Sequence, residues 1–171
     1  MKIILVGYMG SGKSTIGKHL ANFVRIPFYD LDEIIEKREN KSINSIFKKE
    51  GEIYFRKIES KVFNQFISEN ENFVLALGGG TPCYANNHLA LQNTDVNSVY
   101  LKSSVETLTE RLNTEKENRP LISNLNKEEL NDYIRKHLFD RSHYYLQSKH
   151  IINVDNKAIN EIVDEINKVL F

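Results

Sequence analysis

Several features that mark particular protein classes are scarce in this 171-residue chain. Cys83 is its single cysteine, so no intrachain disulfide can form. No apolar run approaches the roughly 18 residues that a membrane-spanning helix needs. Neither sign of charge is in excess, since 23 Lys and Arg balance 23 Asp and Glu, whereas a general nucleic-acid binder usually carries a basic surplus. We therefore expect a cytoplasmic protein that binds neither membrane nor nucleic acid.

The composition that remains is that of an ordinary globular protein. Hydrophobic residues make up 40% of the chain and charged residues 27%. The length suits one domain with one core, and no repeat or linker divides it. We expect a single domain over residues 1–171.

Short apolar runs alternate along the chain with longer amphipathic segments. Strands separated by helices imply parallel pairing, with helices on both faces of an α/β sheet. Ser103 with Glu106, and Asn126 with Glu129, form capping-box patterns that predict helix starts, and Gly51 breaks a helical pattern that begins at Ser42. The predicted strands cover 2–6, 27–29, 73–77, 96–101 and 150–154, and the predicted helices cover 13–24, 31–39, 42–49, 51–68, 103–113, 126–146 and 158–170.

Residues 7–14 read Gly-Tyr-Met-Gly-Ser-Gly-Lys-Ser and match the pattern G-x-x-x-x-G-K-[ST] without a gap. The motif follows a predicted strand and opens a predicted helix, where converging backbone N–H groups and a helix N-terminus bind phosphate. Lys13 can then reach the β- and γ-phosphates of ATP, and Ser14 can offer its hydroxyl to Mg²⁺. The alternative, a simple glycine-rich turn, does not require this spacing or this context. The motif therefore predicts a kinase that transfers the γ-phosphoryl group of ATP to a small molecule.

Two carboxylates follow the second predicted strand. Open α/β sheets bind ligands beyond the carboxyl ends of their strands, so Asp30 and Asp32 are expected at the rim of the site. Side chains at i and i+2 cannot serve the same atom, so one can face the metal while the other faces the acceptor. Asp30 could instead simply cap the helix that begins at Leu31.

Further candidates lie on helices and loops. Gly78, Gly79 and Gly80 follow a buried strand and would expose backbone N–H groups at the ligand edge, although a flexible turn would look the same. Arg56 and Arg141 lie on predicted helices, where isolated arginines are usually solvated. Arg119 lies in a polar loop over 114–125, which is typical either of a lid or of a solvated loop. Cys83 and the pair Tyr144–Tyr145 are interpreted as packed residues.

Taken together, these residues make the chain resemble shikimate kinases nearly from end to end. The P-loop is shared by many kinase families, whereas the combination of the other motifs is far more specific. They are Asp-Leu-Asp at 30–32, Ser-Ile-x-x-Ile-Phe at 42–47, Gly-Glu-x-x-Phe-Arg-x-x-Glu at 51–59, Leu-Gly-Gly-Gly at 77–80, Arg-Pro-Leu at 119–121 and Arg-x-x-x-Tyr at 141–145.

The resemblance implies a three-layer P-loop kinase fold, with a central sheet of five parallel strands and helices on both faces. It also implies a substrate-binding region over about 31–62, a lid over about 114–125, and a monomer that binds ATP, ADP and shikimate. The expected reaction transfers phosphate from ATP to the 3-hydroxyl of shikimate, in the pathway to chorismate and the aromatic amino acids.

The resemblance also implies roles for individual residues. Lys13, Asp32 and Arg119 would be catalytic, and Ser14 and Asp30 would belong to the Mg²⁺ site. Phe47 and Phe55 would line the ring face of the shikimate pocket. ATP binding falls to Gly10, Ser11, Gly12, Lys13, Ser14, Thr15, Arg111 and Arg119, and shikimate binding to Asp32, Arg56, Gly78, Gly79, Gly80 and Arg141.

One departure and two rival interpretations remain at this point. Family members often carry a proline or arginine in the loop near the adenine, where this chain has Asp-Asn-Lys-Ala at 155–158, so adenine contacts there stay unassigned. A kinase for another polyol such as gluconate is one rival, against which the paired arginines and the triple glycine argue. A non-catalytic module is the other, and it would be expected to have lost Lys13, Asp32 or Arg119.

Overall fold

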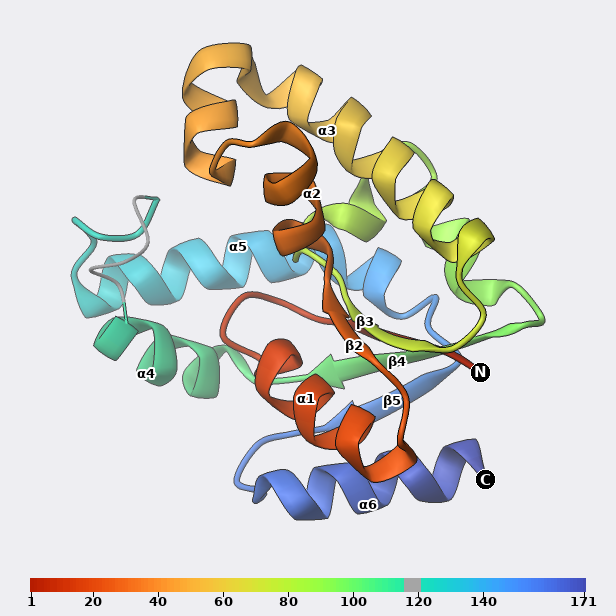
Figure 1. Cartoon of the computed structure of the whole chain (residues 1–171). Coiled ribbons are helices and arrows are strands. Elements are labelled where there is room, and N and C mark those ends of the chain that lie inside the picture. The colour runs from red at the N-terminus through yellow and green to blue at the C-terminus, as the bar shows by residue number, and fades with distance from the viewer. Residues whose placement is uncertain (116–120) are drawn as a thin grey trace.

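The computed structural model describes residues 1–115 and 121–171 and contains a five-stranded parallel sheet in the order β2-β3-β1-β4-β5 (Figure 1). The predicted α/β class and the five-stranded sheet are thereby confirmed. The strands are β1 (Lys2–Val6), β2 (Phe28–Asp30), β3 (Phe73–Ala76), β4 (Val96–Lys102) and β5 (His150–Asn153). The helices are α1 (Lys13–Val24), α2 (Leu31–Glu39), α3 (Ile43–Glu69), α4 (Val105–Glu115), α5 (Lys127–Tyr145) and α6 (Ile159–Leu170), with short 3₁₀ helices η1 (Thr81–Cys83) and η2 (Asn87–Gln92).

Helices cover both faces of the sheet, because apolar side chains of the central strand β1 point to both faces and must be buried. Ile4 and Val6 of β1 point into a core formed with α2, α3, α4 and α5. Ile3 and Leu5 point the other way, into a core formed with α1 and α6. Figure 1 shows α1 and α6 together below the sheet, and α2, α3 and α5 above it. Within the described residues, no helix is both long and apolar enough to cross a bilayer.

The strand register brings the carboxyl ends of β1, β2 and β3 to one level. Ala76 near the end of β3 pairs with Leu5 of β1 and with Asp30 of β2. The chain segments that leave these three strands therefore emerge side by side at the carboxyl end of the sheet. They are the P-loop, the segment from Asp30 to Asp32, and the triple glycine.

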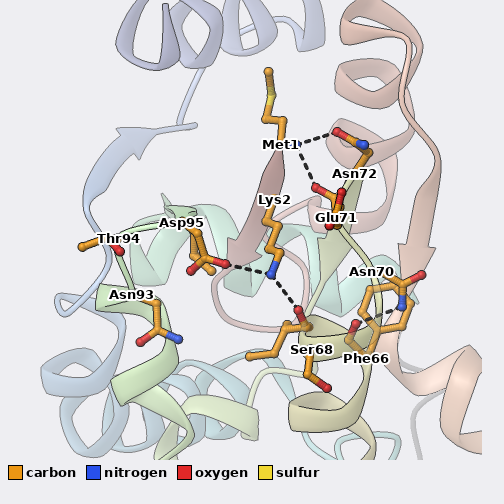
Figure 2. Close-up of polar contacts among 12 residues, drawn as sticks. Met1, Lys2, Phe66, Ser68, Asn70, Glu71, Asn72, Asn93, Thr94 and Asp95 are labelled. Atoms are coloured by element: carbon orange, nitrogen blue, oxygen red, sulfur yellow. Dashed lines mark hydrogen bonds and ion pairs between the residues drawn. The ribbon is translucent and has the colours of Figure 1, made fainter.

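At the opposite end of the sheet, where the strands begin, polar contacts surround the N-terminus, as Figure 2 shows. Lys2 Nζ donates to the Ile67 carbonyl at 2.8 Å and pairs with the Asp95 carboxylate at 2.7 Å. The terminal amino group donates to the Glu71 carbonyl at 2.7 Å. These contacts join β1 to the end of α3 and to the residue just before β4.

Of the two helix starts that capping boxes predicted, one is confirmed and the other is wrong. The capping box at Asn126 and Glu129 is present, with both hydrogen bonds formed. The predicted cap at Ser103 is wrong, because the Ser104 hydroxyl accepts the Thr107 N–H at 3.1 Å and Ser103 is buried. The Asp155 carboxylate accepts the Ser104 N–H at 3.0 Å, so a distant loop takes the place that the predicted Glu106 side chain would have held.

Gly51 interrupts α3 as the sequence indicated, with φ 83° and ψ 171° between two helical segments. This conformation is reached almost only by glycine, and a side chain there would meet nothing within 4 Å. The kink therefore depends on the backbone alone. Ser42 caps the first segment by accepting the Ser45 N–H at 3.2 Å, also as predicted.

We predict that Gly51→Ala lowers the free energy of unfolding by about 1–3 kcal/mol, since alanine must adopt a strained backbone conformation. Chemical denaturation monitored by circular dichroism measures this change. Lys48→Ala, at an exposed helical position one turn earlier, is the matched control and should change stability little. Equal stability of wild type and Gly51→Ala would contradict the role given to the kink.

Candidate active site

The P-loop closes around its own lysine at the carboxyl end of β1. Gly10 and Gly12 have φ of 83° and 90°, in the region that side chains avoid, and Gly12 is the residue from which α1 begins. Lys13 Nζ donates to the carbonyls of Gly7 at 2.8 Å and Tyr8 at 2.9 Å. The ammonium group thus lies over the loop whose N–H groups would bind phosphate.

A cavity of about 490 Å³ lies beyond this edge of the sheet. It runs from the P-loop to the triple glycine on one side and to α4 and the start of α6 on the other. Its volume and the polar residues that line it suit a ligand of nucleotide size. Of the residues predicted from the sequence, the cavity is lined by Gly10, Gly12, Lys13, Ser14, Thr15, Asp30, Asp32, Gly78, Gly79 and Arg111.

Asp30 combines the two roles that the sequence left as alternatives. Its Oδ1 accepts the backbone N–H of Asp32 at 3.1 Å and so caps α2. Its Oδ2 accepts the Ser14 hydroxyl at 2.7 Å. The cap fixes the carboxylate in the position where it faces the P-loop serine.

The Ser14 and Asp30 pair has the chemistry of a partial Mg²⁺ site. A hydroxyl and a carboxylate are hard oxygen donors, and Mg²⁺ is usually held by one or two such groups together with substrate phosphates and water. In the described part of the chain, no cluster of three or more His, Cys, Asp or Glu could bind a metal ion without such help. The residues present therefore fit a metal that arrives with ATP.

Asp32 lies deeper than Asp30 and carries a perturbed charge. Burial raises its pKa to about 6, with further contributions from the carboxylates of Asp30 and Glu59, while Lys13 acts in the opposite direction. A carboxylate with such a pKa can accept a proton near neutral pH more readily than an exposed one. It lies beside Gly78, where a methyl group would come within 3.1 Å of Asp32 Oδ1.

Arg56 lies against the triple glycine, and Glu59 and Tyr84 hold its guanidinium group in place. A methyl group on Gly80 would come within 2.6 Å of its Nη2, so a larger residue there would push this guanidinium away. Its Nη1 donates to Glu59 Oε2 at 2.8 Å, and its plane lies over the Tyr84 ring at 4.1 Å. The Phe55 ring lies 4.5 Å from that of Phe47, so the two predicted pocket phenylalanines pack on each other.

Arg141 reaches the same glycines from α5. A methyl group on Gly79 would lie 3.6 Å from its Nη1. Around it stand the Tyr8 ring, at 5.6 Å, and the side chain of Tyr145, which donates to the Gly79 carbonyl at 2.5 Å. Burial raises the pKa of both tyrosines, so these neighbours of the guanidinium are neutral at pH 7.

Of the two remaining arginines that were predicted to bind ATP, the structure describes one. Arg111 donates to the Gly10 carbonyl at 3.1 Å, at the P-loop side of the cavity. Arg119 lies outside the described residues. The predicted lid over 114–125 begins inside α4, which continues to Glu115, and its Ile122 is fully buried. Burial raises the pKa of the Cys83 thiol to about 11, which agrees with its interpretation as an unreactive residue.

Sequence reasoning gave no role to three residues that hold the site together. Glu59 ends a motif and lies three positions after Arg56, and this helical spacing is a signal that could have paired them. Tyr145 follows Arg141 by four positions in the same way. Its interpretation as a core residue was right about burial and missed its bond to Gly79. Thr81 directly follows the triple glycine, and no local pattern indicates its contacts.

A P-loop at the end of the central strand, a parallel sheet covered on both faces, and acidic and basic side chains around a cavity at the carboxyl edge define a P-loop kinase. The family model described as shikimate kinase matches residues 9–171. The shikimate kinase of Flavobacterium johnsoniae is 54% identical over 169 residues, which cover 99% of this chain and 98% of that one.

Solved structures give the same result. The shikimate kinase of Bacteroides thetaiotaomicron superposes with a TM-score of 0.91 at 34% identity, covering 99% of this chain and 98% of that one. The shikimate kinase of Acinetobacter baumannii in complex with shikimate superposes with a TM-score of 0.87 at 34% identity, covering 99% and 92%. This chain belongs to the shikimate kinase family.

We predict that Asp32→Asn stabilises the fold at pH 8 while removing a site residue. The folded-state pKa of Asp32 is raised to about 6, so its contribution to stability is full below the unfolded pKa near 3.8 and is lost as pH rises through 6. The neutral amide escapes this loss, which is at most of the order of 3 kcal/mol.

Thermal unfolding of both proteins between pH 4 and pH 8 measures the effect. The advantage of the variant should grow between pH 4 and 6 and then level off. Asp164→Asn, on an exposed position of α6, makes the same chemical change without burial and should show no such trend. A constant difference between Asp32→Asn and wild type at all pH values would refute the raised pKa.

Proposed function

We propose that this site transfers the γ-phosphoryl group of ATP to the 3-hydroxyl of shikimate, with Arg56 and Arg141 binding the carboxylate of the acceptor. One observation carries the proposal: guanidinium groups from two different helices lie against the neighbouring residues Gly79 and Gly80, and the half-buried Asp32 lies against Gly78. Two planar cations beside side-chain-free backbone suit a carboxylate.

The surroundings of Arg141 support an anionic ligand in particular. Its neighbours Tyr8, Tyr145 and Cys83 are neutral, and all three have raised pKa values because they are buried. A partly buried guanidinium among neutral groups gains the most from an incoming carboxylate. Arg56, which already pairs with Glu59, supplies the second donor group.

Asp32 is the group that faces the acceptor hydroxyl in this proposal. It orients the 3-hydroxyl and can take its proton, because a pKa of about 6 lets it exchange protons near neutral pH. A loose phosphoryl-transfer transition state demands little from a base, so orientation is the larger part of its role.

The P-loop end of the cavity receives the nucleotide. The loop N–H groups bind the phosphates, and Lys13 turns from the carbonyls of Gly7 and Tyr8 toward the transferring group. Ser14 and Asp30 would hold Mg²⁺, which neutralises phosphate charge when it is bound. Arg111, Lys157 and Ile159 line the cavity where α4 and the start of α6 meet it, and they are the candidates for contact with the adenosine.

The proposal also covers the lid arginine, the oligomeric state and the location of the enzyme. We keep Arg119 as the lid arginine that contacts the transferring phosphate, on the basis of the Arg-Pro-Leu motif. A monomeric, cytoplasmic enzyme that feeds chorismate synthesis completes the proposal. A coupled ADP-release assay with shikimate, gluconate and nucleoside monophosphates tests it, and turnover with gluconate alone would favour the rival polyol kinase.

We predict that Lys13→Met lowers kcat by at least about 100-fold, the scale of one lost transition-state charge contact. The ADP-release assay with shikimate measures it. Lys18→Met is the matched control, since Lys18 is an exposed residue of the same helix, and it should retain wild-type turnover. Near wild-type kcat in Lys13→Met would remove the P-loop from the mechanism.

We predict that Arg56→Ala and Arg141→Ala each weaken shikimate binding by roughly 2–4 kcal/mol, the range for breaking a buried charge pair. The affinity for a non-hydrolysable ATP analogue should change much less. Titration calorimetry with each ligand measures both, and Arg135→Ala, at an exposed position of α5, is the control. Equal losses for the two ligands would mean that the arginines act structurally.

A further inference from the structure

Thr81 is a fully buried polar residue for which the proposed reaction has no direct use. It follows Gly80 and begins η1, so it is placed by the same segment that forms the floor of the acceptor site. Its hydroxyl donates to Glu59 Oε1 at 2.6 Å. Glu59 itself is 1% exposed, so this bond is closed off from water.

Glu59 connects Thr81 to the carboxylate-binding arginine. One carboxylate oxygen accepts the Thr81 hydroxyl, and the other accepts Arg56 Nη1 at 2.8 Å. A carboxylate bonded at both oxygens cannot rotate about its terminal bond without losing one partner. The direction of the Thr81 hydroxyl therefore sets the direction in which Arg56 is held.

Thr81 is in turn fixed by its own backbone. Its N–H donates to the Gly78 carbonyl at 3.1 Å, and its carbonyl accepts Asn87 Nδ2 at 2.9 Å. Asn87 Oδ1 accepts the Ser60 hydroxyl at 2.8 Å, and Ser60 is the neighbour of Glu59 on α3. The bonds close a ring from α3 to η1, to η2 and back to α3.

Gly78 marks the point at which this ring meets the acceptor site. A methyl group on Gly78 would lie 3.0 Å from Thr81 Oγ1, 3.1 Å from Asp32 Oδ1 and 3.3 Å from Glu59 Oε1. Asp32 Oδ1, Glu59 Oε1 and the Thr81 hydroxyl therefore all lie around Gly78, and the hydroxyl donates to Glu59. Glu59 is thus bonded to Thr81 and to Arg56 beside the glycine that Asp32 also contacts.

We propose that Thr81 is a positioning residue for carboxylate recognition, which acts on the acceptor through Glu59 and Arg56. This inference rests on the proposed function, because it presumes that Arg56 binds the carboxylate of shikimate. A purely structural role would make the same buried bond stabilise the loop without any preference for one substrate. The two roles differ in what happens to the KM values for shikimate and ATP.

Steady-state kinetics of Thr81→Val test the proposal, since valine keeps the shape of threonine and removes the donor. We expect KM for shikimate to rise roughly tenfold, the effect of leaving one buried acceptor without its partner. The KM for ATP and kcat should stay within about twofold of wild type. Thr81→Ser, which keeps the hydroxyl, should restore KM for shikimate.

Two controls separate positioning from general stability. Thr109→Val removes another buried hydroxyl, one that donates within α4 to the Val105 carbonyl at 2.7 Å, and should leave KM for shikimate unchanged. Thr81→Ala and Thr81→Ser lack the same methyl group, so their comparison isolates the hydroxyl even if Thr81→Val does not fold.

A double-mutant cycle then tests the route through Arg56. In the Arg56→Ala background, Thr81→Val should add less than about twofold to KM for shikimate, because the residue that it positions is gone. A full tenfold increment in that background, equal rises in both KM values, or wild-type kinetics in Thr81→Val would overturn the inference. Absence of shikimate turnover in the wild type would instead overturn the proposed function, so the two failures are distinct.

Discussion

The parallel pairing of β3 with both β1 and β2 is the constraint on which the site depends. Ala76 pairs with Leu5 on one side and with Asp30 on the other, so the three strands end at one level. The P-loop, the two aspartates and the triple glycine leave the sheet from these ends. A slip in this register would separate the phosphate-binding loop from the acceptor residues, although each motif would remain intact in sequence.

The arginines reach this edge from helices rather than strands, and glycine makes their approach feasible. Arg56 comes from α3 and packs where a side chain on Gly80 would stand, whereas Arg141 comes from α5 and lies at contact distance from Gly79. The absence of a side chain at Gly80 therefore admits the Arg56 guanidinium. Figure 1 shows α3 and α5 on the same side of the sheet, which is what allows both to converge on one loop.

The motifs whose role depends on local geometry could be predicted from the sequence. The P-loop, the strand ends and the Gly51 break follow from spacing and backbone preference, and the structure has them where they were expected. Contacts between distant segments could not be predicted in this way. Ser104 replaces Ser103 as a helix cap because Asp155 reaches it from another loop, and Thr81 meets Glu59 across 22 positions of sequence.

The electrostatics of the acceptor site show why its two cations are not equivalent. Arg56 already has a buried carboxylate partner in Glu59, so its charge is compensated before any ligand binds. Arg141 stands among neutral tyrosines, so its charge is the one that a substrate carboxylate would complete. Asp32, in contrast, is held at a cost to the fold, since its burial opposes ionisation at neutral pH. Within the described residues, Arg141 therefore lacks the carboxylate partner that Arg56 has, and a molecule that carries a carboxylate at one end and a hydroxyl at the other would suit Arg141 and Asp32 together.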